Sequence, residues 1–82
     1  MPEMRLRHIE IFHAVYSSGS VTKAAEILHV SQPSVSKVLA HAEQQLGYRM
    51  FDRVRGYLVP TTEAHHLHDQ VIAVHDKLDR LR

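Results

Sequence analysis

The 82-residue sequence contains no cysteine and no tryptophan, and it has no run of 18 apolar residues. Without cysteine, disulfide frameworks and thiolate zinc sites are excluded, and the composition fits a reducing compartment. Without a long apolar run, no membrane-spanning helix is expected, and the first ten residues lack the hydrophobic core of a signal peptide. These absences favour a cytoplasmic protein with no membrane partner.

A strong excess of one charge is also missing, because the formal net charge is only +1 with the histidines neutral. Residues 1–60 carry seven Lys and Arg against five Asp and Glu, whereas residues 61–82 carry three against four. The total charge therefore does not by itself indicate a nucleic-acid partner. The length leaves room for one small domain and one appended element.

The first half of the chain has helical periodicity. Apolar residues recur at steps of three and four in the first segment: Leu6, Ile9, Phe12, Val15 and Tyr16. This spacing predicts a helix over residues 6–17, with Gly19 as its left-handed C-cap and Ser20 as the N-cap of a second, short helix. A third helix is expected to begin at Ser31 or Gln32, carry Pro33 in its first turn and run to about residue 46.

The pattern changes after Gly47. Two short segments rich in strand formers, separated by Arg55 and Gly56, predict a hairpin over residues 50–59 that Pro60 closes. Thr61 or Thr62 then caps a final helix. Its apolar residues follow heptad spacing: Ala64, Leu67, Val71, Val74, Leu78 and Leu81. We expect this seam to pair two chains, with packing on the first helix of the same chain as the alternative.

A short second helix, a tight turn and a third helix with a polar outer face make a helix-turn-helix, and a following hairpin makes the winged variety. The expected fold is therefore mainly α. A winged helix-turn-helix occupies residues 1–60, with the helix-turn-helix at about 20–46 and the wing at about 50–59, and a linker and dimerisation helix occupies residues 61–82. The third helix begins with SQPSVS, whose small polar side chains suit a first turn that enters the major groove of DNA.

Several motifs resemble the N-terminal DNA-binding domain of LysR-type transcriptional regulators. They are TKAAEILHVSQPSVS at residues 22–36, EQQLGYRMFDR at 43–53, the opening LRHIEIFHAV and the wing RVRGYLVPT. The resemblance covers essentially the whole chain and includes the lysine-biosynthesis regulator branch of the family. It implies a bacterial transcription factor that binds partly symmetric promoter sites as a homodimer or tetramer, with RNA polymerase as a further candidate partner.

The resemblance also implies an effector-binding domain that this sequence does not contain. We expect no cofactor in the chain itself, and the small-molecule effector of the further domain is unknown. The chain is then a fragment that ends after the linker helix, which we favour, or a naturally truncated regulator.

The family's functional positions fall on residues of this sequence in four groups. Those expected to contact DNA are Ser20, Thr22 and Lys23 in the second helix, Ser31, Gln32, Pro33, Ser34, Ser36 and Lys37 in the third, and Arg53 and Arg55 in the wing. Those expected to form the dimer seam are Leu67, Val71, Val74, Leu78 and Leu81.

Three positions depart from the family's pattern. Lys37 replaces the usual Arg, so bidentate reading of guanine is less expected. Ala42 replaces a preferred Leu, which should thin the core under the third helix. Ala64 replaces a common Gly, which should stiffen the start of the linker helix.

Other classes of function fit the sequence less well than DNA binding. A helix-turn-helix can serve purely as a protein-interaction module, but a protein-binding helix should show an apolar anchor where the third helix is polar. His65, His66, His68 and Asp69 lie close together in sequence, but no other ligand cluster completes a metal site, and no catalytic arrangement is recognisable. Protonation of the histidines near pH ~6.5 should instead tighten non-specific DNA binding.

Overall fold

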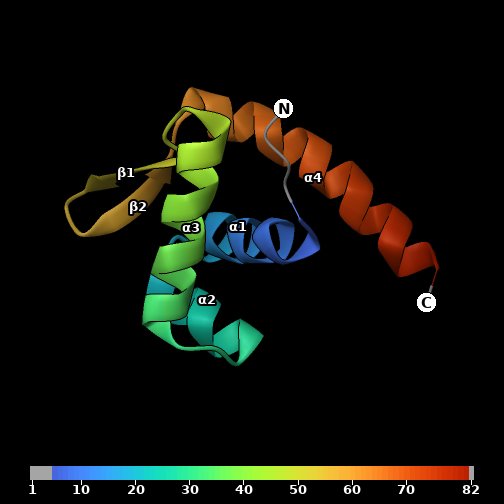
Figure 1. Cartoon of the computed structure of the whole chain (residues 1–82), viewed down its shortest axis with the longest axis horizontal. Helices are drawn as coiled ribbons and strands as arrows, with labels where there is room; N and C mark the ends of the chain where they lie inside the picture. The colour runs from blue at the N-terminus through green and yellow to red at the C-terminus, as the bar shows by residue number, and fades with distance from the viewer. Residues whose placement is uncertain (1–4, 82) are drawn as a thin grey trace.

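Four helices and one hairpin follow each other along the chain, in a computed structural model that describes residues 5–81. The order is α1 (Leu6–Ser18), α2 (Val21–Leu28), α3 (Gln32–Leu46), β1 (Phe51–Val54), β2 (Tyr57–Pro60) and α4 (Thr62–Arg80). In Figure 1, α3 stands across α1 and α2, the hairpin projects beyond it, and α4 leaves the body on the other side. The predicted winged helix-turn-helix with an appended helix is confirmed.

The helix ends lie at the residues whose local chemistry indicates them. Gly19 ends α1 with a φ of 70°, and its N–H donates to the carbonyl of Val15. The starts of α2, α3 and α4 are capped by side-chain oxygens that accept the N–H of the residue three positions ahead, at Ser20, Ser31 and Thr61. Of the two threonines considered for the last helix, Thr61 is the cap.

The core is centred on α1, which contacts α2, α3, α4 and β2. Its largest fully buried side chains come from α1, α3 and the start of the wing: Phe12, Ile11, Met50, Val15 and Val35. Ala42 lies in this core with 3% of its surface exposed, so α3 packs there through a methyl group. Ala64 and Val71 of α4 belong to the same cluster, which fixes the first half of α4 to the body.

The hairpin is an antiparallel pair in which Arg53 faces Leu58 and Val54 faces Tyr57. Its two-residue turn has positive φ at both positions, 51° at Arg55 and 83° at Gly56, as the type I′ turn of a tight hairpin requires. Pro60 is part of β2, so the hairpin spans residues 51–60 and not the predicted 50–59.

Candidate nucleic-acid interface

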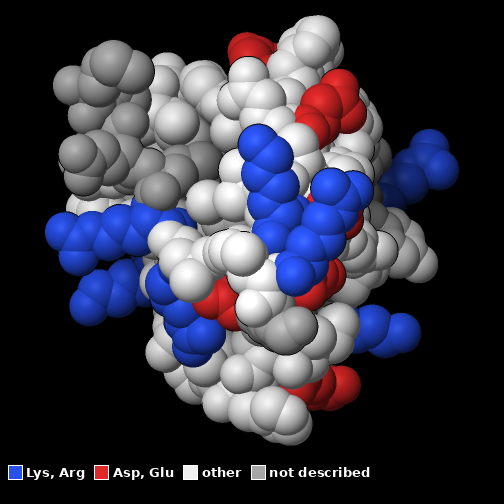
Figure 2. Space-filling model, turned by 90° about the vertical axis from the view of Figure 1, so that its right-hand side faces the viewer, with Lys and Arg blue, Asp and Glu red and all other residues white. Residues whose placement is uncertain are grey.

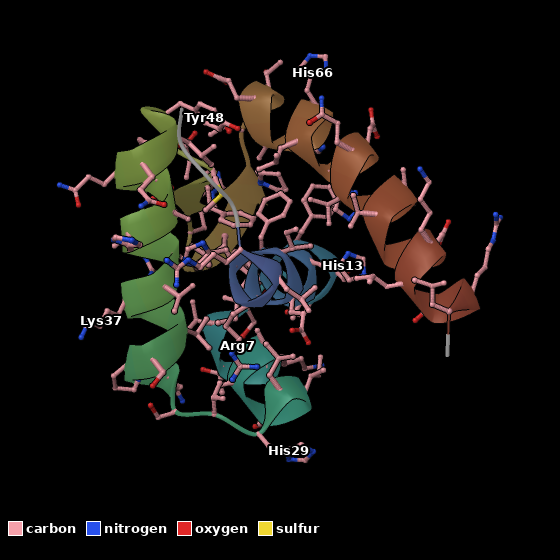
Figure 3. The ribbon with its side chains drawn as sticks, turned by 45° about the vertical axis from the view of Figure 1, so that its right-hand side comes forward. Arg7, His13, His29, Lys37, Tyr48 and His66 are labelled. Atoms are coloured by element: carbon pink, nitrogen blue, oxygen red, sulfur yellow. The ribbon has the colours of Figure 1, made fainter. Side chains whose placement is uncertain are left out.

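The N-terminal turn of α3 is exposed and polar, as expected for a helix that enters a DNA groove. Every one of the six α3 residues expected to contact DNA, including the cap Ser31, is exposed. Figure 3 shows Lys37 pointing outward from α3, away from α1. The larger apolar side chains of α3 are directed inward, since Val35 and Leu39 are buried and Val38 and Leu46 pack on the core. The outer face therefore offers no apolar anchor to a protein partner.

Two of the expected contact residues use their hydroxyls in hydrogen bonds at the start of α3. Ser31 Oγ accepts the N–H of Ser34 at 3.2 Å, and the two hydroxyls lie 2.8 Å apart in a hydrogen bond. Within residues 5–81, the side chains of Gln32 and Ser36 make no such bond. Gln32 and Ser36 are therefore the polar side chains of this turn best placed to reach an external ligand.

A groove of about 340 Å³ joins α2, α3 and the wing. Five of the residues expected to contact DNA line it: Ser20, Thr22, Gln32, Ser36 and Arg53. They come from three segments, which the fold brings to one surface. The carbonyl of Gly19 accepts the N–H of Leu58 at 3.4 Å and ties the wing to the start of α2.

The start of α2 contributes backbone N–H groups to this surface. Ser20 Oγ accepts the N–H of Lys23 at 3.2 Å, which satisfies one of the backbone N–H groups that the first turn leaves without a helical partner. Thr22 and Lys23 are exposed beside it. The remaining donors and the positive end of the helix favour an anion such as a phosphate group.

The wing presents two cations at different distances from α3. Arg53 lines the groove beside α3, whereas Arg55 lies in the turn at the tip, and both are exposed. Tyr57 also lines the groove and is 71% exposed, a residue that the sequence did not single out. The sequence could have indicated Tyr57, because an aromatic side chain in a hairpin without a second layer of structure remains exposed.

A carboxylate anchors the wing to α3, and its role was not predicted. Glu43 Oε2 accepts the N–H of Met50 at 2.6 Å and of Phe51 at 3.4 Å. Arg49 forms an exposed ion pair with Asp52 at 3.2 Å and donates to the carbonyl of Phe51. These bonds fix the start of β1 and with it the position of Arg53.

The expected dimer seam on α4 divides into two parts. Val71 is 3% exposed and Leu67 packs against the core, so the seam as predicted is wrong for Val71, whose side chain is used within its own chain. The reason is that α1 lies under the first half of α4. Beyond Val71 the apolar residues are accessible: Val74 and Leu81 are exposed and Leu78 is half-buried. Ile72, which was not predicted, is 40% exposed.

A family model described as "Bacterial regulatory helix-turn-helix protein, lysR family" matches residues 6–65. The chain belongs to the LysR family. Its fold is that of the winged helix-turn-helix DNA-binding domains of LysR-type regulators.

Curated relatives agree with this assignment. The chain is 57% identical over 79 residues to the HTH-type transcriptional regulator DgcR of a Pseudoalteromonas species, covering 96% of the chain and 27% of the relative. It is 49% identical over 81 residues to the transcriptional activator protein LysR of Escherichia coli strain K12, covering 99% of the chain and 26% of the relative. The chain thus spans about a quarter of the length of these LysR-type relatives.

Solved structures of LysR-family domains have the same fold. The BenM DNA-binding domain in complex with catB site 1 DNA matches with a TM-score of 0.89 at 32% identity, over 95% of this chain and 88% of that one. The DNA-binding domain of CbnR, in a complex with DNA, matches with a TM-score of 0.86 at 27% identity, over 94% and 88%. Full-length BenM matches with a TM-score of 0.86 at 32% identity, and the chain covers 26% of it.

The LysR-type relatives are transcriptional regulators. Among the side chains that the structure describes, no group of three or more His, Asp or Glu could hold a metal ion. Over the same residues no helix is long and apolar enough to span a bilayer.

Proposed function

We propose that this chain is the DNA-binding and dimerisation part of a LysR-type regulator and binds partly symmetric promoter sites in a sequence-specific manner. The observation that carries the proposal is the groove that joins the start of α2, the outer side of α3 and the wing, lined by five residues expected from sequence to contact DNA. The solved DNA complexes of the BenM and CbnR domains support it, because those domains share this fold.

The exposed residues divide by chemistry into readers of base edges and binders of phosphate. Gln32 has an amide that can pair with the N6 and N7 edge of adenine in the major groove, and Ser36 adds an adaptable hydroxyl. Pro33 and Ser34 shape the surface beside them. Lys37 carries a single flexible ammonium that can reach either guanine or phosphate.

Phosphate contacts are assigned to the flanks of α3. Ser20, Thr22 and Lys23 bring the start of α2 against one strand, and Arg53 brings a cation against the backbone near the wing. Arg55 at the wing tip is placed to enter the minor groove, which is more negative where A·T tracts narrow it.

Dimerisation is assigned to the second half of α4. Val74, Leu78 and Leu81 form an apolar stripe beyond the part of α4 that packs on α1. A second copy of the chain is the partner that a partly symmetric site requires, because two-fold symmetry of the protein mirrors that of the DNA. A tetramer would require further contacts outside this chain.

The whole regulator carries further assignments that rest on the family. An effector-binding domain with a small-molecule ligand, a contact with RNA polymerase and a location in the bacterial cytoplasm are all proposed on that basis. The chain itself is assigned no cofactor and no catalytic role.

Selection of bound fragments from random DNA tests this function directly. The selected fragments should share a two-part motif, and a gel shift across a range of salt concentrations should show at least about 10³-fold preference for it over scrambled DNA. Recovery of unrelated fragments, or equal affinity for both duplexes at every salt concentration, would instead favour the protein-interaction module.

A further inference from the structure

Aromatic side chains of α1 and α4 meet where the two helices cross. Tyr16 and His68 lie face to face with ring centroids 3.6 Å apart and planes inclined by 9°. His13 meets the edge of His68 in a nearly parallel plane, with ring centroids 5.3 Å apart and an interplanar angle of 10°. Figure 3 shows His13 in the space between α1 and α4. We name the three rings Tyr16, His68 and His13 the ring stack.

Hydrogen bonds across this junction depend on the protons of the imidazoles. His13 Nδ1 and His68 Nε2 are 3.2 Å apart, so one nitrogen carries the hydrogen and the other accepts it. One added proton leaves this bond possible, whereas two place a hydrogen on both facing nitrogens and two positive charges side by side. His65 Nδ1 lies 2.7 Å from the hydroxyl of Tyr16, a bond that survives protonation by reversing its direction.

The surroundings of His68 disfavour its charged form. His68 is 8% exposed, and Phe12 approaches it edge-on from α1. Burial is the first cause that lowers the pKa of His68, and His13 and His65 lower it further, whereas Asp69 opposes them. His13 and Tyr16 face it from α1, and β2, the other element packed on α4, has no carboxylate, imidazole or cation.

We propose that the ring stack is a pH-sensitive joint that positions α4 on the DNA-binding body and opens when His13 and His68 are both protonated. The joint lies one turn before Val71, and α4 is largely exposed beyond that residue. Its geometry therefore sets the angle between the dimerisation stripe and α3. This consequence rests on the proposed function, because the angle matters only when two copies bind paired half-sites.

The direction of the pH effect follows from linkage. A histidine whose pKa is lowered in the packed state takes up its proton more readily once α4 has separated. The joint is therefore complete above pH ~6.5, the ordinary histidine value, and weakens as the pH falls below it through the lowered value. Each proton taken up on opening multiplies the opening equilibrium by at most about tenfold per pH unit.

Amide hydrogen exchange of the 82-residue chain without DNA tests the joint alone. Between pH 7.5 and 5.5, after correction for intrinsic exchange, residues 65–72 of α4 should lose protection relative to α3, by up to about tenfold for each histidine that takes up a proton on opening. His68→Phe keeps a flat ring on Tyr16 and cannot be protonated, so it should remove this differential loss. His13→Asn, at the half-buried partner, should reduce it without changing the core.

Two other histidine variants are controls for a non-specific effect of low pH on the whole fold. His41 of α3 and His8 of α1 form another histidine pair, with ring centroids 5.7 Å apart. His41→Gln removes this pair and should leave the α4 response intact. His66→Gln alters an exposed histidine of α4 and should do the same. Equal loss in α3 and α4, or the same loss in His68→Phe, would overturn the joint.

A binding experiment on duplexes that carry the site selected at pH 7.5 separates the joint from the proposed function. The wild-type preference for correctly spaced half-sites over a single half-site should fall at pH 5.5, and His68→Phe should retain it. A wild-type preference that persists unchanged at pH 5.5 contradicts the joint alone. Absence of any preference at pH 7.5 contradicts the proposed dimer, while the exchange experiment still decides whether the joint exists.

Discussion

Arg55 adopts a backbone conformation that costs it free energy. Its φ of 51° lies in the left-handed region, where a residue other than glycine pays about 1–2 kcal/mol, and the type I′ turn prefers Asn, Asp or Gly at this position. The cation at the wing tip is therefore kept at some cost to the hairpin. We interpret this cost as the consequence of a role for Arg55 in binding rather than in folding.

Replacing Arg55 by Asn separates these two roles. Arg55→Asn suits the turn and should not destabilise the hairpin, but it removes the charge that the minor groove would bind. Binding to sites with A·T-rich flanks should weaken more than binding to sites with G·C-rich flanks, as measured by titration at fixed salt. Arg55→Lys keeps the charge and is the control. Equal losses for both flanks would leave Arg55 as a phosphate contact or a surface charge.

Glu43 holds the first residues of the wing in place. Glu43→Ala leaves the N–H groups of Met50 and Phe51 without their acceptor, at a cost of about 1–3 kcal/mol. The amides of Met50 and Phe51 should exchange faster, and affinity should fall because Arg53 is no longer held in place. Glu43→Gln keeps one acceptor oxygen and should lose less. Unchanged exchange in Glu43→Ala would show that the wing is held by its other contacts.

At the scale of elements, local signals predict where each helix begins and ends. The sequence identified the caps Gly19 and Ser20 and narrowed the caps of α3 and α4 to two residues each, because caps need only neighbouring backbone groups. Contacts between distant elements could not be predicted in the same way. Heptad spacing on α4 indicates an apolar face but not whether α1 or a second chain covers it, and Val71 is covered by its own chain. The rings that contact His68 could not be predicted either, because they depend on how α4 crosses α1.

The division of α4 at Val71 predicts different outcomes for two neighbouring valines. Val71→Ala removes buried methyl groups and should lower the free energy of unfolding by about 1–3 kcal/mol, as measured in urea. Val74 is 42% exposed, so Val74→Asp should spare the fold of one chain and convert the dimer into monomers in sedimentation. A Val74→Asp protein that stays dimeric would place the interface elsewhere, and a Val71→Ala protein of unchanged stability would contradict the packing on α1.

At the scale of the whole molecule, the charge is nearly balanced and its arrangement matters more than its sum. Figure 2 shows the side opposite the wing, where Lys and Arg side chains are interspersed with Asp and Glu. The candidate interface lies on the other side, along α3 and the wing. The molecule extends 38 Å along its longest axis, and α4 contributes about 28 Å of helix. DNA recognition is therefore expected to depend on a few placed side chains rather than on bulk attraction.

In the proposed function, α3 reads sequence through its first turn while the wing supplies affinity. The decisive measurement is the ratio of affinities for the selected site and for random DNA, taken across a salt series for Gln32→Ala and Arg53→Ala. Gln32→Ala should lose about 1–3 kcal/mol on the selected site and little on random DNA, so its ratio falls. Arg53→Ala should weaken both alike and flatten the slope of log K against log salt by about one per site. An unchanged ratio in Gln32→Ala would show that α3 does not read sequence through its first turn.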